Sequence, residues 1–454
     1  MIVNKAGDII RILFVQPHIM PPVYNPLYTL FYRKFGSLTY IRDFYQMLLQ
    51  LGAVTPKKHI VKFIDERFEK VNFNEDYDLV TIASPTDYTT RAYEIADEFR
   101  NRGKKVVLCD YHPTILAEEA KQHADSIIVG EGELTWPKLL EDFQNENLKP
   151  FYKQETPVDP KLTPPARRDL VKKYHRLIVR LQATRGCPIG CEFCRVPSFE
   201  GKKLRKRPVE NVIKEIKSIR QKLLFFGDGS LTIDPEYTKS LFREMKGLRK
   251  KFFCCGNPDV LAEDDELLKV AKAAGCIIWY VGLESVNQET IDLLGKKTNV
   301  VEKYDLMVKK IHKYGMAVSG SFIHGFDNDT FEDFDKTLAK IYDLKLDHVE
   351  FNLLTPYPGT PLYERLEKEG RILTKDWYNY REGQSGTEIV FRPKNITRED
   401  LFREGRARLL HKWYGGPGMN KKEFRIKKMK LIKEGLNLGF YPFIYRTFGY
   451  LFHL

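Results

Sequence analysis

The sequence predicts an α/β protein with two parallel-sheet domains, and two observations lead to that prediction. Over residues 1–145, short β-branched runs alternate with segments of helical periodicity, and from residue 176 the alternation resumes with a different spacing. Such alternation is typical of parallel sheets whose faces are covered by helices. We therefore expect a doubly wound domain over residues 1–145 and a six-stranded partial barrel over residues 176–363. The length of 454 residues is sufficient for two or three domains.

Five strands are expected in the first domain, at Ile10–Val15, Ile60–Ile64, Leu79–Ser84, Lys105–Cys109 and Ser126–Val129. Helical periodicity lies at Ile41–Leu51, Thr90–Arg102, Thr114–His123 and Leu134–Phe143. Ligands of such sheets bind at the carboxyl ends of the strands. Residues 146–175 contain five prolines and no apolar period, so we expect an interdomain linker there.

Six strands are expected in the barrel, at Leu177–Thr184, Leu223–Phe226, Phe252–Cys255, Ile277–Leu283, Ala317–Ile323 and His348–Leu354. The helices between them are expected at Val209–Gln221, Pro235–Arg249, Asp264–Ala274, Val300–Tyr314 and Phe331–Leu344. Chemistry should lie at the carboxyl ends of these strands. After Pro361 the barrel pattern ends, and residues 364–454 are expected to form a helical C-terminal region.

Composition excludes several classes of protein. The chain has 43% hydrophobic and 30% charged residues, the balance of a globular protein. Seven cysteines spread over this length do not fit a small disulfide scaffold. No stretch approaches the ~18 apolar residues of a membrane-spanning helix. The first apolar run, Ile9–Val15, contains Arg11 and follows Asp8, unlike a signal peptide, so we expect a cytoplasmic protein with reduced thiols.

Three cysteines lie within eight residues, directly after the first expected barrel strand: Cys187, Cys191 and Cys194. Iron–sulfur clusters are held by Cys thiolates, and a set of three leaves one iron of a cubane open. A structural zinc site is the alternative, and it needs a fourth ligand nearby. Gly186 and Gly190 are expected at positive φ, because a loop around a cluster needs backbone room.

The other thiols of the second domain, Cys254, Cys255 and Cys276, have no ligand spacing. We expect them to be buried apolar thiols rather than ligands of a second cluster.

The C-x-x-x-C-x-x-C spacing resembles the radical S-adenosylmethionine (SAM) superfamily. The resemblance implies a 4Fe-4S cluster on Cys187, Cys191 and Cys194 whose open iron binds SAM. One electron from the cluster then cleaves SAM to a 5′-deoxyadenosyl radical that abstracts hydrogen. The resemblance also implies a one-electron reductant of the flavodoxin or ferredoxin type, and it identifies no catalytic side chain.

Further segments match this superfamily in chain order. Phe193 fits an aromatic that packs near adenine, and Gly227-Asp228-Gly229 takes the place of a Gly-Gly-Glu-like turn that binds the amino group of SAM. Glu284 is expected to bind ribose or amino groups, and the segment Ser321–Gly325 to contact adenine. The resemblance thus implies these SAM-binding residues: Phe193, Gly227, Asp228, Gly229, Glu284, Ser321, Ile323 and Gly325.

The first domain resembles the cobalamin-binding branch of the superfamily, which implies a Rossmann-like fold. Ser84-Pro, His112-Pro-Thr and the segment Ala124–Glu133 carry the resemblance, and it implies these cobalamin-binding residues: Ser84, His112, Gly130 and Glu131. Two features depart from the branch. The fourth strand ends in Cys109-Asp110-Tyr111 instead of Gly-Gly, and no Asp-x-His-x-x-Gly follows the first strand. A cobalamin site and a degenerate domain kept for packing or substrate gating both remain open.

The C-terminal tail, Lys421–Leu454, is basic and then aromatic. Seven Lys or Arg lie between Lys421 and Glu434, with apolar residues at helical spacing among them. The Phe- and Tyr-rich segment that follows completes the pattern of an anchor on an anionic membrane surface. Packing of the tail on its own barrel is the alternative. RNA binding is a further alternative, but no RNA-binding domain is recognisable, so nucleic acid is not expected as a partner.

The segment from Tyr357 through Asp376-Trp-Tyr to Val390–Thr397 resembles the hopanoid methylases of this branch. Our leading hypothesis is therefore a radical SAM enzyme that methylates an unactivated carbon of a lipid or isoprenoid by way of cobalamin. Without cobalamin, the same radical would cyclise, couple or desaturate the substrate. A modifier of RNA or of a protein residue, and a cobalamin or iron–sulfur sensor, are the other hypotheses.

Overall fold

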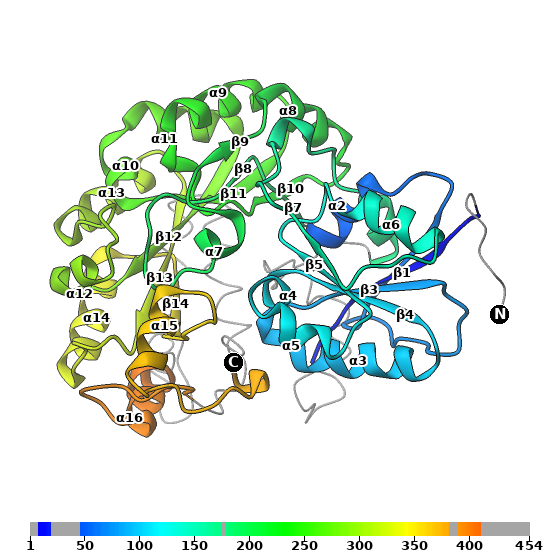
Figure 1. Ribbon diagram of the computed structural model, residues 1–454. Coiled ribbons are helices and arrows are strands. Elements are labelled where there is room, and N and C mark those ends of the chain that lie inside the picture. The colour runs from blue at the N-terminus through cyan, green and yellow to red at the C-terminus, as the bar shows by residue number, and fades with distance from the viewer. Residues whose placement is uncertain (1–7, 20–45, 175–177, 381–388, 410–454) are drawn as a thin grey trace.

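The structure is a computed structural model that describes residues 8–19, 46–174, 178–380 and 389–409, without the side chains of 406–408. Two α/β lobes lie side by side, the first blue to cyan and the second green to orange (Figure 1). Each lobe is built on a six-stranded parallel sheet, and a two-stranded antiparallel sheet of β8 (Thr184–Arg185) and β9 (Arg205–Lys206) follows the first strand of the second. The expected α/β fold is confirmed.

The first sheet has the strand order β2-β1-β3-β4-β5-β6. Its strands are β1 (Arg11–Gln16), β2 (Ile60–Asp65), β3 (Leu79–Ala83), β4 (Lys105–Cys109), β5 (Ser126–Val129) and β6 (Phe151–Lys153). Phe14 packs into the core on one face of the sheet and its neighbours Leu13 and Val15 into the core on the other. Because both faces are buried, β1 is apolar at consecutive positions, as in other parallel sheets. The helices are α2 (Gln46–Val54), α3 (Thr89–Asn101), α4 (Tyr111–Ile115), α5 (Ala117–Lys121) and α6 (Trp136–Gln144).

Two elements of this lobe differ from the sequence-based expectations. Residues 151–153, inside the expected linker, form β6, which pairs in parallel with β5. The helix expected over Thr114–His123 is divided at Leu116, whose φ of −116° and ψ of 56° are not helical. The first part begins earlier than expected, at Tyr111, because the Asp110 carboxylate accepts a 2.6 Å hydrogen bond from the Tyr111 N–H and caps the helix.

The second sheet has the strand order β14-β13-β12-β11-β10-β7, which follows the chain strand by strand, as expected for a partial barrel. Its strands are β7 (Ile178–Leu181), β10 (Leu223–Phe226), β11 (Lys251–Cys255), β12 (Cys276–Glu284), β13 (Ala317–His324) and β14 (His348–Leu353). The helices lie outside the curve of the sheet (Figure 1): α8 (Val209–Ser218), α9 (Pro235–Met245), α10 (Pro258–Glu263), α11 (Asp265–Ala274), α12 (Gln288–Leu293), α13 (Tyr304–Lys313) and α14 (Phe331–Leu344). A small apolar cluster that includes Phe253 and Ile278 fills the bottom of the barrel.

The chain after the barrel forms α15 (Pro361–Lys368) and α16 (Arg398–Phe402) and returns to the first lobe. Between them, the Trp377 indole N–H donates a 2.8 Å hydrogen bond to Glu119, and its ring lies 4.9 Å from that of His112. This region therefore ties the two lobes together. The tail Lys421–Leu454 lies outside the described residues.

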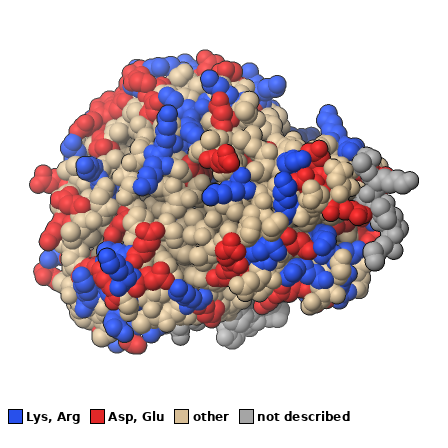
Figure 2. Space-filling view, in the orientation of Figure 1, with Lys and Arg blue, Asp and Glu red and all other residues tan. Residues whose placement is uncertain are grey.

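Surface charge and helix length bear on the membrane expectation. On the face shown in Figure 2, basic and acidic side chains are interspersed over both lobes, so the net charge of +13 is not gathered into one patch on this face. Within the described ranges, no helix combines the length and apolar character needed to cross a membrane.

Candidate active site

The three clustered cysteines lie on the loop between β8 and the short helix α7 (Val196–Glu200). Gly186 and Gly190, expected at positive φ, have φ of 81° and 80°. A Cβ on Gly186 would lie 2.3 Å from the backbone oxygen of Lys203, so only glycine fits there. The Cys187 N–H donates a 3.1 Å hydrogen bond to the Gly201 carbonyl, which fixes the start of the loop.

All three thiols line one cavity of about 340 Å³ at the carboxyl end of the barrel. Burial raises the pKa of each thiol, to about 12 for Cys191 and about 11 for Cys194. A buried thiolate therefore needs a positive partner, and a bound metal deprotonates a coordinating thiol outright. Three soft thiols on one glycine-shaped loop fit an iron–sulfur cluster.

The same residues fit a single metal ion less well. In the part of the chain that the structure describes, no three His, Cys, Asp or Glu side chains gather in a way that could hold one metal ion. A cubane requires a different arrangement, in which each thiolate binds its own iron.

Five of the expected SAM-binding residues line the cavity of the three thiols: Phe193, Gly229, Glu284, Ser321 and Ile323. The other three lie elsewhere. Gly227 and Asp228 line the adjoining cavity described below. Gly325 lines neither cavity; its N–H donates a 2.7 Å hydrogen bond to Asp329.

The Asp228 carboxylate is hydrogen bonded to neighbouring residues of the barrel. It accepts hydrogen bonds from the Ala183 N–H at 3.0 Å and from the Thr184 hydroxyl at 2.7 Å, and so joins the ends of β7 and β10. Burial raises its pKa to about 6. The acidic side chain of the Gly-Asp-Gly turn therefore positions the strand that leads into the cysteine loop.

Glu284 has a partner that the sequence analysis did not identify, the buried ammonium of Lys296. Lys296 also donates a 2.7 Å hydrogen bond to the Gly282 carbonyl, and both charged side chains line the thiol cavity. The Glu284 carboxylate raises the pKa of Lys296 despite its burial, so the ammonium stays charged. Glu284 itself has φ of 61°, a strained conformation of the kind that gathers at functional sites.

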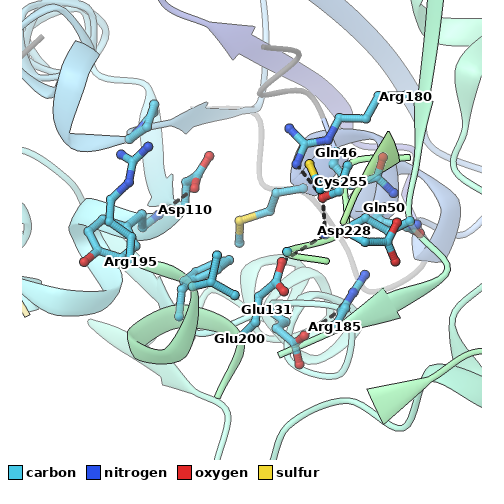
Figure 3. Close-up of a pocket in the computed structure, with 18 of the residues that line it drawn as sticks. Gln46, Gln50, Asp110, Glu131, Arg180, Arg185, Arg195, Glu200, Asp228 and Cys255 are labelled. Atoms are coloured by element: carbon cyan, nitrogen blue, oxygen red, sulfur yellow. Dashed lines mark hydrogen bonds and ion pairs between the residues drawn. The ribbon is translucent and has the colours of Figure 1, made fainter. Parts of the chain in front are cut away.

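A second cavity, of about 460 Å³, lies between the lobes, with Gln46, Asp110, Arg180 and Asp228 among its walls (Figure 3). It shares five lining residues with the thiol cavity: Arg195, Val196, Gly229, Cys255 and Tyr280. The two cavities therefore adjoin. A molecule in the second cavity would lie beside a molecule held at the cysteines.

The barrel side of this second cavity carries polar groups. Arg180 crosses Gly227, where a Cβ would lie 2.0 Å from the guanidinium, and donates a 3.0 Å hydrogen bond to the Gly227 carbonyl. The Tyr280 hydroxyl is hydrogen bonded to Glu350 on β14. Cys255, expected to be a core thiol like Cys254 and Cys276, instead lines both cavities, and only the other two are fully buried.

Of the four residues expected to bind cobalamin, Glu131 lines the second cavity. Its carboxylate is paired with Arg185, at 3.0 Å, and with Arg205, at 2.8 Å. Ser84, His112 and Gly130 do not line the cavity. His112 is fully buried, and its two ring nitrogens lie 3.2 Å from the Thr86 hydroxyl and 3.1 Å from the Glu119 carboxylate.

Asp110, directly after the end of β4, has a backbone conformation that glycine favours. Asp110 has φ of 92°, a value that favours glycine, at the position where the resemblance expects Gly-Gly. Burial raises the pKa of its carboxyl group to about 6. The Tyr111 ring beside it lies 6.2 Å from Phe199 and 5.4 Å from the Arg195 guanidinium, so aromatic side chains occupy this edge of the second cavity.

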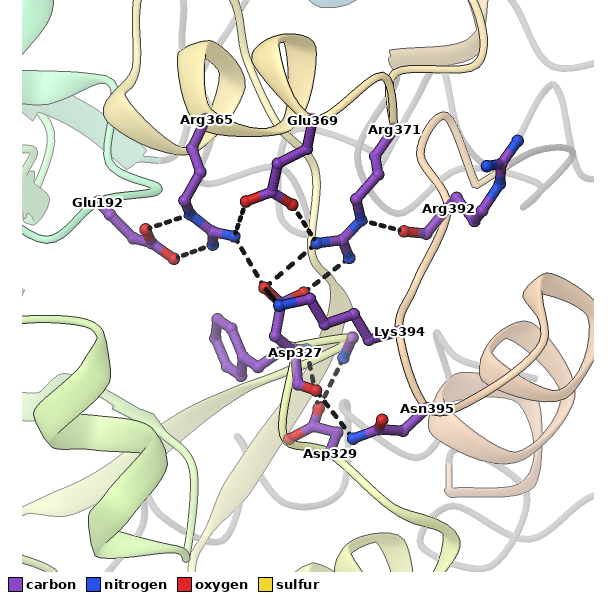
Figure 4. A network of polar contacts seen from close by, with 11 residues as sticks. Glu192, Asp327, Asp329, Arg365, Glu369, Arg371, Arg392, Lys394 and Asn395 are labelled. Carbon is purple, nitrogen blue, oxygen red and sulfur yellow. Dashed lines mark hydrogen bonds and ion pairs between the residues drawn. The ribbon is translucent and has the colours of Figure 1, made fainter.

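A network of ion pairs connects the cysteine loop to α15 and to the segment that follows β13 (Figure 4). Arg365 on α15 binds Glu192, between the second and third cysteines, at 2.9 Å, and binds Asp327 at 2.7 Å. Arg371 binds the other oxygen of Asp327 at 2.7 Å. The loop is thus held by the barrel end and by the C-terminal region together.

Comparison with known proteins gives several matches. The sequence profile of the radical SAM superfamily matches residues 181–341. The bacteriochlorophyllide d C-8(2)-methyltransferase of Chlorobaculum tepidum is 34% identical over 74% of this chain and 79% of its own. The bacteriochlorophyllide d C-12(1)-methyltransferase of the same organism is 32% identical over 83% of each chain. The hopanoid C-2 methylase of Rhodopseudomonas palustris is 26% identical over 73% of this chain and 66% of its own.

A solved structure has a similar fold over most of this chain. The cobalamin-dependent S-adenosylmethionine radical enzyme OxsB, with aqua-cobalamin and S-adenosylmethionine bound, superimposes with a TM-score of 0.67 at 14% identity, over 94% of this chain and 71% of its own. At that identity the likeness shows the fold.

Proposed function

Because the chain belongs to the radical SAM superfamily, in the methyltransferase family that the two bacteriochlorophyllide relatives represent, we propose that it methylates an unactivated carbon of a large, mainly apolar substrate. The observation that carries this proposal is the pair of adjoining cavities. One has the residues for a cluster and SAM, and the other, between the lobes, is where a methyl carrier or a substrate would lie beside them. Radical chemistry requires the reacting carbon to lie next to the site of SAM cleavage.

In the thiol cavity, Cys187, Cys191 and Cys194 hold the 4Fe-4S cluster, and Phe193, Glu284 and Ile323 contact SAM. The cluster supplies the electron that cleaves SAM. The buried ammonium of Lys296 lies where it offsets negative charge, either of the thiolates or of the SAM carboxylate. The aromatic and aliphatic walls exclude water, which protects a reactive radical from side reactions.

In the cavity between the lobes, we place cobalamin against the carboxyl edge of the first sheet, where ligands of such sheets bind. When bound, cobalamin would supply the methyl group that the substrate radical accepts, and one electron from the reductant together with the methyl group of a second SAM would restore it. Residues of both lobes line this cavity, among them Gln50 and Glu133 of the first lobe and Arg180 of the second. The side chains of Asp110 and Tyr111 line this cavity after β4 and occupy space there that glycines would leave free.

A lipid or isoprenoid is the substrate class we propose, because aromatic side chains such as Tyr111, Phe199 and Phe225 dominate the apolar walls of the second cavity. The hopanoid C-2 methylase among the relatives supports it. A tetrapyrrole is the second candidate, favoured by the two relatives above 30% identity and by Arg180, a cationic group suited to a carboxylate side chain.

The test supplies reconstituted enzyme, hydroxocobalamin and a chemical reductant with SAM that carries a deuterated methyl group. Separate reactions contain a total isoprenoid lipid extract, bacteriochlorophyllide d, or bulk RNA with cell protein. We expect mass spectrometry to find the intact deuterated methyl group in the lipid reaction. Label in the pigment reaction would select the tetrapyrrole, and label only in RNA or protein would overturn both.

A further inference from the structure

Arg195 directly follows Cys194, the third cysteine of the loop, and it lines both cavities. Of the five residues that the two cavities share, it is the one with a charged side chain. Its carbonyl accepts hydrogen bonds from the N–H groups of Ser198 at 3.1 Å and Phe199 at 3.2 Å, so its backbone is fixed at the start of α7. A cationic side chain on a fixed backbone therefore lies beside a proposed cluster ligand.

The Arg195 guanidinium is held from both lobes. Asp87, in the short 3-10 helix Thr86–Tyr88 after β3, forms an ion pair with it at 3.3 Å. The centre of the Tyr111 ring, also in the first lobe, lies 5.4 Å from the guanidinium carbon. On the barrel side, the centre of the Tyr357 ring lies 4.3 Å from the same carbon. All three partners are buried, so the positive charge has a defined position.

The charge of this ion pair can act on a cluster at the cysteines. The Arg195 side chain is 25% exposed and that of Asp87 is 5% exposed, so water screens the two charges only in part. An iron–sulfur cluster gains one negative charge when it is reduced, and the charges around it contribute to its reduction potential. The guanidinium thus favours the reduced cluster, whereas the carboxylate opposes reduction.

We propose that Arg195 is a positioning residue that sets the reduction potential of the cluster, and that Asp87 of the first lobe limits its effect. This inference rests on the proposed cluster at the three cysteines. Because Asp87 and Tyr111 belong to the first lobe, the place of that lobe against the barrel contributes to the potential of a cluster held by the barrel.

The test is a redox titration of the full chain with its cluster reconstituted, in the absence of SAM and corrinoid. EPR measures the ratio of reduced to oxidised cluster at one fixed potential. Arg195→Met should lower this ratio about 3- to 10-fold, because one positive charge is removed from a partly buried site. Arg195→Lys keeps the charge and should restore most of the wild-type ratio.

Asp87→Asn should raise the same ratio, because it removes the opposing charge and leaves the guanidinium in place. Arg195→Met and Asp87→Asn break the same ion pair, so opposite shifts distinguish an effect of charge from a loosened loop. Arg91→Met is the matched control: Arg91 pairs with Glu66 at 2.7 Å, their side chains are 32% and 8% exposed, and neither lines either cavity. It should leave the ratio unchanged.

The outcomes separate this inference from the proposed function. Iron content and circular dichroism show which variants are folded and loaded, and if Arg195→Met loses the cluster, the comparison of Asp87→Asn with wild type decides. An unchanged ratio in loaded variants, or shifts of Arg195→Met and Asp87→Asn in the same direction, overturns the role of Arg195 while the cluster stands. Wild-type protein that assembles no cluster overturns the proposed function and this inference with it.

Discussion

Single side chains decide the chemistry at the cysteine loop. Replacing Cys187, Cys191 or Cys194 singly by Ala should abolish the visible charge-transfer absorption of the cluster and the reductive cleavage of SAM, because two thiolates do not hold a cubane in a site built for three. Replacing Cys276, a buried thiol outside both cavities, is the control and should leave both intact. A triple Ala variant that still binds about four irons and cleaves SAM would contradict the assignment.

Glu284 tests SAM binding separately from cluster assembly. Glu284→Ala should weaken SAM binding by about 10- to 150-fold with iron content unchanged, because a charge-assisted hydrogen bond contributes roughly 1.5–3 kcal/mol. Circular dichroism checks that the loss is not caused by unfolding around the Lys296 ammonium that the substitution leaves unpaired. Glu289→Ala, an exposed carboxylate on α12, serves as the control in isothermal titration with SAM. Wild-type affinity in the Glu284 variant would assign this carboxylate a purely structural role.

The sequence reveals residues whose role depends on local spacing and hides those whose role depends on a distant partner. The cysteine spacing and the two glycines at positive φ are local, and they could be predicted. Lys296 lies 12 residues from Glu284 and shows no motif, so only the fold reveals their pairing. Cys255 has the sequence environment of a core thiol, but it is the last residue of β11 and lines both cavities at the carboxyl end of the barrel.

At the scale of elements, α15 and the cysteine loop act together through Arg365. Replacing Arg365 by Met removes the pairs with Glu192 and Asp327 and frees the loop between the second and third cysteines. Because Arg365 is partly exposed, we expect a loss of only about 1 kcal/mol in the free energy of unfolding. The cluster should respond more, with a broadened EPR signal and several-fold faster loss of iron to a chelator.

Arg365→Lys should partly restore both properties of the cluster, because it keeps the charge. Arg403→Met, on an exposed ion pair with Asp400, should leave the cluster unchanged. If the Arg365→Met protein loses iron no faster than the wild type and the Arg403→Met control, the ion-pair network does not position the cluster.

Several strands could be predicted almost residue by residue, because their apolar runs are short and are bounded by turn signals. The bounds of β4, β5 and β10 agree with the expectation at both ends. The three residues of β6 are too few to show any period, and only pairing with β5 makes them a strand. The break at Leu116 could not be predicted either, because a single non-helical residue leaves the surrounding apolar pattern unchanged.

At the scale of the whole molecule, the lobes are joined by buried ion pairs beside the cluster. Arg185 binds Glu131 at 3.0 Å and Glu133 at 2.6 Å, and all three side chains are less than 10% exposed. These residues are 54 and 52 positions apart, so the sequence gives no sign of the pairs. Arg185 directly precedes Gly186, so these ion pairs join the segment after β5 to the start of the cysteine loop.

The tail Lys421–Leu454 carries a prediction of its own. Truncation before Lys421 should leave a folded enzyme that still cleaves SAM, and only its binding to vesicles should fall. Each Lys or Arg near an anionic surface contributes about 1 kcal/mol, a contribution that salt screens, whereas the aromatic stretch adds a part that salt does not remove. Sedimentation with anionic and neutral vesicles measures both. Equal failure of the intact and truncated proteins to sediment would contradict a membrane role.

We propose that this chain couples radical cleavage of SAM to methyl transfer through cobalamin. The most direct measurement is anaerobic quantification of two products of SAM by the reconstituted enzyme with reductant and its methyl acceptor, with and without hydroxocobalamin. We expect both 5′-deoxyadenosine and S-adenosylhomocysteine when the corrinoid is present, and loss of S-adenosylhomocysteine when it is omitted. Formation of 5′-deoxyadenosine alone, unaffected by the corrinoid, would contradict it.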